Sequence, residues 1–429
     1  MKALTFKSKL SFITIIILMS SINGFAQGWE IVYDSISTMG RQVSLTNDSC
    51  YIVTGAGSPV SSGISLKIDQ QGKILWLAPF GGYSIQPTYD QGYIIAGGDN
   101  YISAILKKLD KNGNYVWSNT YGGASQDDFQ SVIQSSDSGF VACGYSGSYG
   151  DSSIYVVKTD AFGNFLWRRS FYSADFGLAR DLLEFDNHYY IAGYYDDFSN
   201  NPYLFVAKLN SEGMTIWRKD YQTRAAGFSI TITNDSSLIV AGRNFLTKLN
   251  LNGDTLWSRN YDPYWHLYSV DNTSDNDFII SGHLSIGAGS ENLLVKSDSA
   301  GNILWHRTYP TGCFESVITA TNKSYIMCGY SWYNSIPKLR IIKIDSNGTA
   351  GQLDSNFENK LINIYPNPSK GKFSIVTDGI GKIQIIDLQG KEVYIGNEKE
   401  IDLSQKAKGI YIIKITTNKQ TLTRKLIKQ

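Results

Sequence analysis

The sequence is poor in proline, cysteine and histidine: its 429 residues include 9 Pro, 4 Cys and 4 His. Charged residues make up only 18% of the chain. Glycine (40) and tyrosine (28) are abundant instead, and this composition suits many short strands joined by tight turns. Beyond residue 26 no apolar run is long enough to cross a bilayer, so we expect no transmembrane segment in the mature protein.

The motifs of several enzyme classes are also missing. The chain contains no nucleophile elbow, no phosphate-binding loop and no metalloprotease helix motif. Its histidines do not have the spacing of metal ligands, so we predict no metal site from them. These four residues are His188, His266, His283 and His306.

Residues 1–26 have the features of a secretory signal peptide. Lys2, Lys7 and Lys9 precede an apolar run at residues 12–19, and Ala26 ends a small-residue cleavage pattern. The apolar run is too short for a membrane span. We therefore expect export, with a mature chain that begins at Gln27 and is secreted or held at the outer cell surface.

Charge is unevenly distributed along the chain, whose net charge is +1. From Asn363 onward there are twelve Lys and Arg against six Asp and Glu, so the part between the signal peptide and this tail is mildly acidic. An acidic main domain argues against nucleic-acid binding.

One motif occurs seven times: Lys, any residue, Asp or Asn, two residues, then Gly. In six copies a Trp follows the Gly after four residues, and an aromatic residue follows that Trp after four more. The Lys and Gly pairs are Lys67/Gly72, Lys108/Gly113, Lys158/Gly163, Lys208/Gly213, Lys248/Gly253, Lys296/Gly301 and Lys343/Gly348. The six tryptophans are Trp76, Trp117, Trp167, Trp217, Trp257 and Trp305.

This spacing predicts a hairpin at every copy. The Asp or Asn side chain caps a type I turn, and the Gly adopts the positive φ that closes it. We expect each repeated Lys to lie at a strand end, near the Asp of its own motif.

A second motif precedes each Lys: two or three β-forming residues, a small residue and Gly, as in residues 140–144 and 325–329. Together the motifs indicate four strands in each unit of about 40 to 50 residues. Cys143 and Cys328 occupy the small position, so we predict that both are buried free thiols. Cys50 and Cys313 have no obvious partner.

A four-stranded unit repeated at this period is typical of a β-propeller. Gly348 lacks its Trp, but Trp29 near the N-terminus has an aromatic residue, Tyr33, at the usual spacing. We therefore predict an all-β protein with a seven-bladed β-propeller over residues 27–350. The N-terminal strand would close the ring by pairing with the strand through Lys343.

The Lys–Asp–Gly–Trp element resembles the tryptophan-docking repeat of pyrroloquinoline-quinone-type propellers. Whole units, such as residues 122–140, more closely resemble propeller repeats of exported Bacteroidetes proteins. A quinone enzyme would need metal-ligating and catalytic acids and, in the best-known members, adjacent cysteines, which this sequence lacks. The resemblance indicates the fold better than the function.

The C-terminal part has a different pattern. Residues 351–362 are polar and weakly patterned, as expected of a linker. Residues 363–429 contain five motifs in order, at 364–368, 371–373, 387–391, 401–404 and 409–414, with alternating strands between Gly turns. They closely resemble the type A C-terminal sorting domain of the type IX secretion system. The resemblance implies a small Ig-like β-sandwich that the type IX machinery recognises.

Candidate binding residues come from loops of variable length. The interval from the Gly of the second motif to the Lys ranges from six to fifteen residues, whereas the other turns are constant. These loops combine aromatic residues with Ser, Asn and Gly, which suits sugar or peptide surfaces, although such rings could equally pack on one another. The candidate aromatic residues are Tyr145, Tyr149, Tyr194, Tyr195, Trp332 and Tyr333.

Two acidic pairs lie in loops that we expect on the same face, at residues 127–128 and 196–197. Asp128 and Asp197 are the candidates from these pairs. They could hold calcium, the one cofactor left open, or act as general acid and base, or simply be solvated.

We predict a non-catalytic binding or adhesion module, exported by the type IX system, for an extracellular glycan or protein. The alternative is a polysaccharide-active or quinone-type enzyme, for which Asp128 and Asp197 are the only candidate acids. A third hypothesis is a scaffold that only displays its surface.

Overall fold

The structure is a computed structural model, and it describes most of the chain. The described residues are 28–33, 38–57, 63–99, 103–123, 125–148, 153–171, 176–196, 201–221, 225–287, 289–310, 312–333, 336–349, 363–365, 367–376, 381–416 and 421–429. The predicted signal peptide (1–26) and linker (351–362) lie outside them.

The described chain is all-β apart from one 3-10 turn, Thr321–Lys323. The first three sheets are formed by β2 (Met39–Leu45), β3 (Tyr51–Ala56), β4 (Ile64–Ile68) and β5 (Ile74–Ala78); by β6 (Ser84–Pro87), β7 (Tyr93–Asp99), β8 (Ser103–Leu109) and β9 (Tyr115–Tyr121); and by β10 (Asp127–Gln134), β11 (Phe140–Ser146), β12 (Ser153–Thr159) and β13 (Phe165–Phe171). In each sheet the strands pair antiparallel in chain order.

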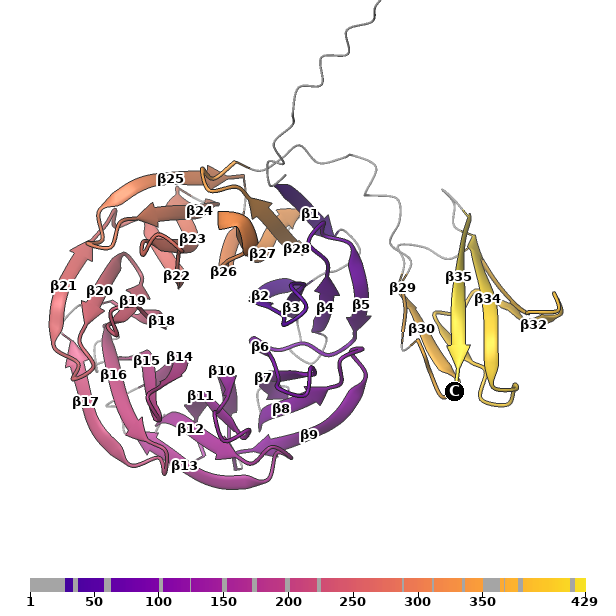
Figure 1. The fold of residues 1–429 in the computed structure, drawn as a ribbon, viewed down its shortest axis with the longest axis horizontal. Coiled ribbons are helices and arrows are strands. Elements are labelled where there is room, and N and C mark those ends of the chain that lie inside the picture. Colours follow the sequence, from indigo (N-terminus) through magenta and orange to yellow (C-terminus); the bar gives the residue numbers. More distant parts are fainter. Residues whose placement is uncertain are drawn as a thin grey trace, which may run out of the picture.

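Four further sheets also have four antiparallel strands, in chain order except that the last sheet includes β1. They are formed by β14 (Gly177–Phe185), β15 (His188–Asp196), β16 (Pro202–Asn210) and β17 (Thr215–Tyr221); by β18 (Gly227–Ile232), β19 (Leu238–Gly242), β20 (Phe245–Leu249) and β21 (Thr255–Asn260); by β22 (Trp265–Asn272), β23 (Phe278–Ile286), β24 (Gly289–Ser297) and β25 (Ile303–Tyr309); and by β26 (Cys313–Thr319), β27 (Tyr325–Tyr333), β28 (Ile336–Ile344) and β1 (Trp29–Tyr33). Figure 1 shows the seven sheets arranged around a central axis as the blades of a propeller. We number them blades 1 to 7 in this order.

The predicted turns form where the sequence places them. In blade 2 the carboxylate of Asp110 accepts the backbone N–H groups of Asn112 and Asn114, both at 2.8 Å, and Gly113 has a φ of 79°. The hairpin between the third and fourth strands thus has the capped turn that Asp and Gly at this spacing require.

Each repeated Trp packs on the turn of the next blade. The ring of Trp76 in blade 1 lies against Gly113 in blade 2, where a Cβ atom would come within 2.5 Å of the indole. Tyr121, four residues after Trp117, donates its hydroxyl to the carbonyl oxygen of Gly163 at 2.7 Å. Glycine is therefore required twice at these turns, for its positive φ and for the room it leaves to the indole.

Blade 7 takes its fourth strand from the N-terminal part of the chain. Strand β1 pairs antiparallel with β28, with Trp29 opposite Lys343. The indole of Trp29 lies against Gly72 of blade 1, and its Nε1–H donates to the carbonyl oxygen of Gln70 at 2.9 Å.

The C-terminal strands form two more sheets. One contains β29 (Asn363–Tyr365), β30 (Lys372–Val376) and β33 (Glu400–Asp402); the other contains β31 (Lys382–Asp387), β32 (Glu392–Gly396), β34 (Gly409–Thr416) and β35 (Thr421–Lys428). Both sheets contribute to a single apolar cluster that includes Phe373, Ile385 and Ile413.

Among the described residues there is no helix with the length and hydropathy needed to cross a bilayer.

Candidate functional site

In six of the seven blades the innermost strand has one extra residue opposite its partner strand. In blade 4, for example, the register between β14 and β15 shifts between Ala179 and Asp181, which leaves Arg180 unpaired in the ladder. A bulged residue is turned away from the regular pleat. These six bulged residues line one central cavity together with Tyr83, which directly precedes β6 in blade 2. The seven residues are Arg41, Tyr83, Gln130, Arg180, Phe228, Tyr268 and Glu315.

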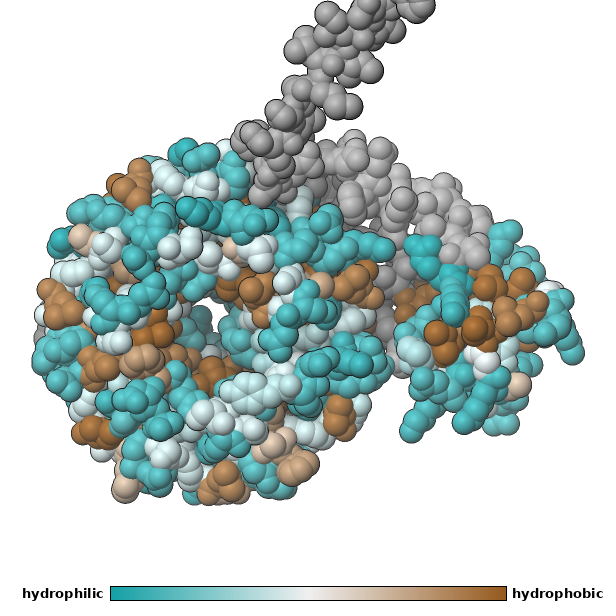
Figure 2. All heavy atoms as spheres, viewed as in Figure 1, coloured by the Kyte–Doolittle hydropathy of each residue, from teal (hydrophilic) through white to brown (hydrophobic). Residues whose placement is uncertain are grey.

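This cavity lies at the propeller axis, where Figure 2 shows a narrow opening between the blades. Its volume is about 90 Å³. Pockets that enclose whole small molecules are typically larger, roughly 300 Å³ or more. The cavity therefore has room for one polar group or a few water molecules.

The residue after each of these seven links its blade to the next. Ser84 Oγ accepts the N–H of Val132, Asp181 Oδ2 accepts that of Ile230 and Ser316 Oγ accepts that of Val43, at 3.2, 3.0 and 3.3 Å. The seven linking residues are Gln42, Ser84, Ser131, Asp181, Ser229, Ser269 and Ser316. We refer to these seven as the polar belt.

Asp181 is the charged member of the belt. Its carboxylate accepts hydrogen bonds from Ser131 Oγ, Ser229 Oγ and the N–H groups of Leu182 and Ile230, at 2.9 to 3.1 Å. Burial raises the pKa of Asp181, and these four donors act in the opposite direction because they stabilise the carboxylate. Asp181 is thus committed to holding blades 3, 4 and 5 together.

The two arginines of the cavity have different partners. Arg41 forms an ion pair with Glu315 at 3.2 Å, which joins blades 1 and 7. Arg180 instead donates from Nη1 to the side-chain oxygen of Gln130 at 2.8 Å, and its guanidinium lies 5.3 Å from the ring centroid of Phe228.

Asp128 is connected to this second arginine through Gln130, whose Nε2 donates to Asp128 Oδ1 at 3.1 Å. Burial raises the pKa of Asp128, while the hydrogen bond from Gln130 and the charge of Arg180 oppose that shift. Asp128, Gln130 and Arg180 therefore form one polar chain across blades 3 and 4.

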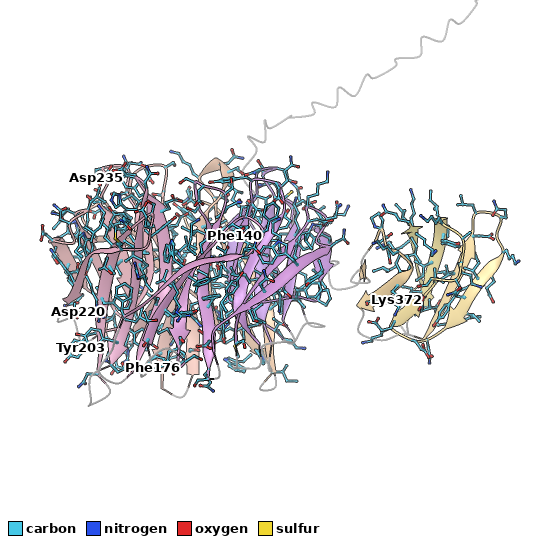
Figure 3. All side chains as sticks on the ribbon, turned by 90° about the horizontal axis from the view of Figure 1, so that it is seen from below. Phe140, Phe176, Tyr203, Asp220, Asp235 and Lys372 are labelled. Carbon is cyan, nitrogen blue, oxygen red and sulfur yellow. The ribbon has the colours of Figure 1, made fainter. Side chains whose placement is uncertain are left out.

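Beside the cavity lies a row of aromatic rings, which we call the aromatic arc: Tyr145, Phe176, Tyr194, Phe228 and Tyr268. Successive ring centroids are 5.0, 6.1, 6.3 and 5.0 Å apart. Every one of these rings is partly exposed. Figure 3 shows Phe176 and Tyr203 near one edge of the propeller and Asp235 near the opposite edge. We call the edge with Phe176 the loop face.

The predicted aromatic candidates do not all gather at this arc. Tyr145 and Tyr194 belong to it, joined through Phe176. Tyr195 stacks instead on Tyr203 at 5.6 Å, under the guanidinium of Arg218. Trp332 is 43% exposed and packs edge-on against Tyr330 at 5.4 Å, in blade 7.

The remaining candidates are only partly described. Tyr149 and Asp197 lie outside the described residues, as does the side chain of Tyr333. Asp127, the neighbour of Asp128, accepts from the N–H of Gly123 and from Ser148 Oγ at 2.9 and 2.7 Å, so it shapes its own loop. The calcium site that we left open stays a prediction.

Sequence reasoning missed Phe176, Phe228, Tyr268, Gln130 and Arg180. A pattern in the sequence could have found the axial residues: once per blade, one of the seven cavity-lining residues listed first is followed by Ser, Gln or Asp and then by Val, Ile or Leu. This triplet marks the residues that line the axis.

On the face opposite the loop face, the repeated lysines do not pair with the acids that we expected. Lys67 pairs with Asp48 at 2.6 Å, and Lys108 pairs with Asp90 at 2.8 Å. These partners lie in the turn between the first two strands of the blade, and not in the motif of the lysine itself. The prediction was wrong because the Asp of the motif uses its carboxylate to cap its own turn, as Asp69 does for the N–H groups of Gln71 and Lys73.

The structure also places the cysteines and histidines. All four cysteines are free, and Cys143 and Cys328 are buried, which confirms the prediction for these two thiols. The rings of His266 and His283 stack at 4.4 Å on adjacent strands of blade 6. Among the described residues, no three His, Cys, Asp or Glu side chains are grouped so that they could hold a metal ion.

Comparison with known proteins identifies the C-terminal part. Residues 363–429 match the family model of the secretion system C-terminal sorting domain, which confirms the sequence-based prediction. This domain marks proteins that are exported to the cell surface or secreted, so the chain is an exported protein. No curated protein matches the chain in sequence.

Several solved structures share the propeller fold. The WD40 β-propeller domain of Doa1 has a TM-score of 0.53 and 13% identity, over 76% of this chain and 100% of that one. A streptogramin B lyase has a TM-score of 0.51 and 13% identity, over 74% and 98%. Virginiamycin B lyase from Staphylococcus aureus has a TM-score of 0.50 and 10% identity, over 74% and 99%. At these identities the likeness concerns the fold alone.

Proposed function

We propose that this exported protein is a non-catalytic binding module that recognises an extracellular ligand on its loop face. The observation that carries the proposal is the aromatic arc. Five partly exposed rings from four blades follow one another beside a cavity that is lined by polar side chains. Rigid rings next to a few fixed polar groups are the usual composition of a ligand site.

The polar groups near the arc suit binding better than catalysis. Asp181 is saturated by four donors, and Glu315 is paired with Arg41. Two carboxyl groups flanking a substrate would be needed for glycoside hydrolysis. Of the candidate acids only Asp128 lies in the described part of the arc region, where it is hydrogen-bonded to Gln130.

The architecture that presents this site is part of the proposal. We infer that β1 closes the ring, because it supplies the fourth strand of blade 7 while Trp29 packs on blade 1. We also propose the domain limits given above. The C-terminal unit would be an Ig-like sandwich, since both of its sheets share one apolar cluster. Its partner would be the type IX secretion machinery.

The test is binding of the chain without residues 1–26 to broad glycan and protein arrays. We expect specific binding that Tyr194→Ala and Tyr268→Ala weaken, while Tyr203→Ala, which removes a ring outside the arc, has little effect. An absence of binding on both arrays, from protein with an unchanged melting temperature, would contradict the proposal.

A polysaccharide-active enzyme is the second candidate, and the raised pKa of Asp128 favours it because a general acid must retain its proton. Turnover of a polysaccharide by the wild type that is lost in Asp128→Asn would establish this alternative. Binding without turnover would exclude it for the polysaccharides tested.

A further inference from the structure

Arg180 stands apart from the other charged groups of the axial cavity. Among the described residues no carboxylate lies within ion-pair distance of it, in contrast to Arg41, which is paired with Glu315. The neutral oxygen of Gln130 takes one N–H group, and the ring of Phe228 covers one face of the guanidinium. The Nε atom is buried and has no hydrogen-bond partner.

In this environment the positive charge of Arg180 has no carboxylate partner among the described residues. A guanidinium presents its N–H groups as a planar fork that matches the two oxygens of a carboxylate. An anion in the cavity would bond the terminal Nη groups, of which Gln130 takes one N–H, and hydrogen bonds to a charged group are stronger than neutral ones. Because Gln130 and Phe228 fix the orientation of the fork, little ordering remains to be done when the anion arrives.

The shape of the site limits the rest of the ligand. The cavity holds about 90 Å³, which is enough for a carboxylate but not for a ring as well. A ring attached to that carboxylate would lie outside the cavity, beside Phe228 and Tyr194, whose centroids are 6.3 Å apart.

The arc also extends beyond a single ring. From Tyr145 to Tyr268 it crosses blades 3 to 6 with a nearly regular spacing. A row of rings offers successive stacking positions to a polymer of rings, whereas a peptide terminus would use only the carboxylate position.

We propose that Arg180 anchors the carboxylate of a uronic acid residue, and that the loop face therefore selects acidic polysaccharides. This inference rests on the proposed binding function of the same face. A peptide with a free C-terminal carboxylate is the competing ligand.

The experiment uses the chain without residues 1–26 and four probes in titration calorimetry. The probes are an oligogalacturonate, its methyl ester, a neutral galacto-oligosaccharide of equal length and a short peptide with a free C-terminus. We expect binding of the oligogalacturonate only. Arg180→Gln should lower its affinity roughly ten- to a hundredfold, as expected for loss of a hydrogen bond to a charged group. Arg180→Lys should restore only part of the lost affinity, because the lysine ammonium cannot form the two parallel hydrogen bonds of a guanidinium.

The control variant is Arg259→Gln, which removes an exposed arginine on an outer strand. It should bind like the wild type, and the melting temperatures of all variants report whether the fold is intact. Equal binding of the neutral and acidic sugars, unchanged in Arg180→Gln, would overturn the uronate assignment and leave the binding function standing. Binding of the peptide alone would also overturn the assignment. Failure of every probe here and on the arrays would overturn both proposals.

Discussion

The indole of Trp29 lies against the backbone of Gly72, although the two residues belong to blades at opposite ends of the sequence. Two atoms of the indole would be 3.2 Å from a Cβ atom added to Gly72. The indole N–H also donates to the carbonyl oxygen of Gln70. The same type of contact joins Trp217 to Gly253, between two blades that follow each other in the chain.

We expect Trp29→Ala to lower the free energy of unfolding by roughly 3 kcal/mol, near the lower limit for a Trp to Ala change because the ring is half-buried. Urea unfolding measures the loss, and limited proteolysis should show earlier cleavage of the N-terminal strand. Trp217→Ala is the matched comparison, because Trp217 makes the same contact with Gly253 between two blades that follow each other in the chain. Deletion of residues 27–40, which removes β1, should open the ring entirely. A melting temperature unaffected by this deletion would refute closure by the N-terminal strand.

The repeated lysines give a second prediction. The side chain of Lys158 is 2% exposed and pairs with Asp137, which is 57% exposed, at 2.5 Å. Removing only the acid leaves a buried charge without its partner, which costs more than removing the charge itself. Asp137→Asn should therefore destabilise the fold by about 2 kcal/mol, less than a fully buried pair would because water reaches Asp137. Lys158→Met should cost less.

Denaturant unfolding of both single variants and the double variant separates these effects. The double variant should be more stable than Asp137→Asn alone, because it no longer contains the unpaired lysine. If Lys158→Met proved the most harmful of the three, the pair would be stabilising in itself and the argument from desolvation would fail.

The repeats and turns could be predicted from sequence because their determinants are local. Asp110 and Gly113 are three residues apart, and the chemistry of that turn depends on nothing distant. The axial cavity could not be predicted in this way. Its residues are one per blade, about 45 positions apart, and a bulge such as that at Arg180 is visible only once the strands have paired.

The aromatic candidates show a further limit. Tyr194 and Tyr195 are adjacent in β15, and adjacent residues of a strand point to opposite faces of the sheet. The structure accordingly places Tyr194 in the aromatic arc and Tyr195 on Tyr203. Applying the strand alternation to the loop-proximal residues would have separated the two from sequence alone.

The polar belt provides a third prediction. Six blades have Ser or Gln at the position that Asp181 occupies in blade 4. Asp181→Ala should lower stability by roughly 2–4 kcal/mol, since the N–H of Ile230 and two serine hydroxyls would lose their acceptor. Asp181→Ser should restore much of this loss, because Ser229 bonds Val270 from the equivalent position of blade 5. Thermal unfolding measures the stability of both variants. An equal loss of stability in Asp181→Ala and Asp181→Ser would contradict a linking role.

The stacked histidines of blade 6 predict how stability depends on pH. Burial lowers the pKa of His283 from 6.5 to about 4, and the charges of His266 and Arg243 act in the same direction. Between these values the unfolded chain binds a proton at His283 and the folded chain does not. Stability is therefore retained above pH 6.5 and lost as the pH falls towards 4.

The loss from His283 should amount to about 1–2 kcal/mol after allowance for solvent screening at this half-buried site. His283→Gln, which cannot be protonated in this range, should flatten the decline of the melting temperature between pH 6.5 and 4. His306→Gln is the control, because His306 is exposed on the outer strand β25. Since His266 also has a lowered pKa caused by burial and Arg243, the double variant His266→Gln/His283→Gln should flatten the decline further. A slope in His283→Gln identical to that of the wild type would show that the stacked pair does not govern acid stability.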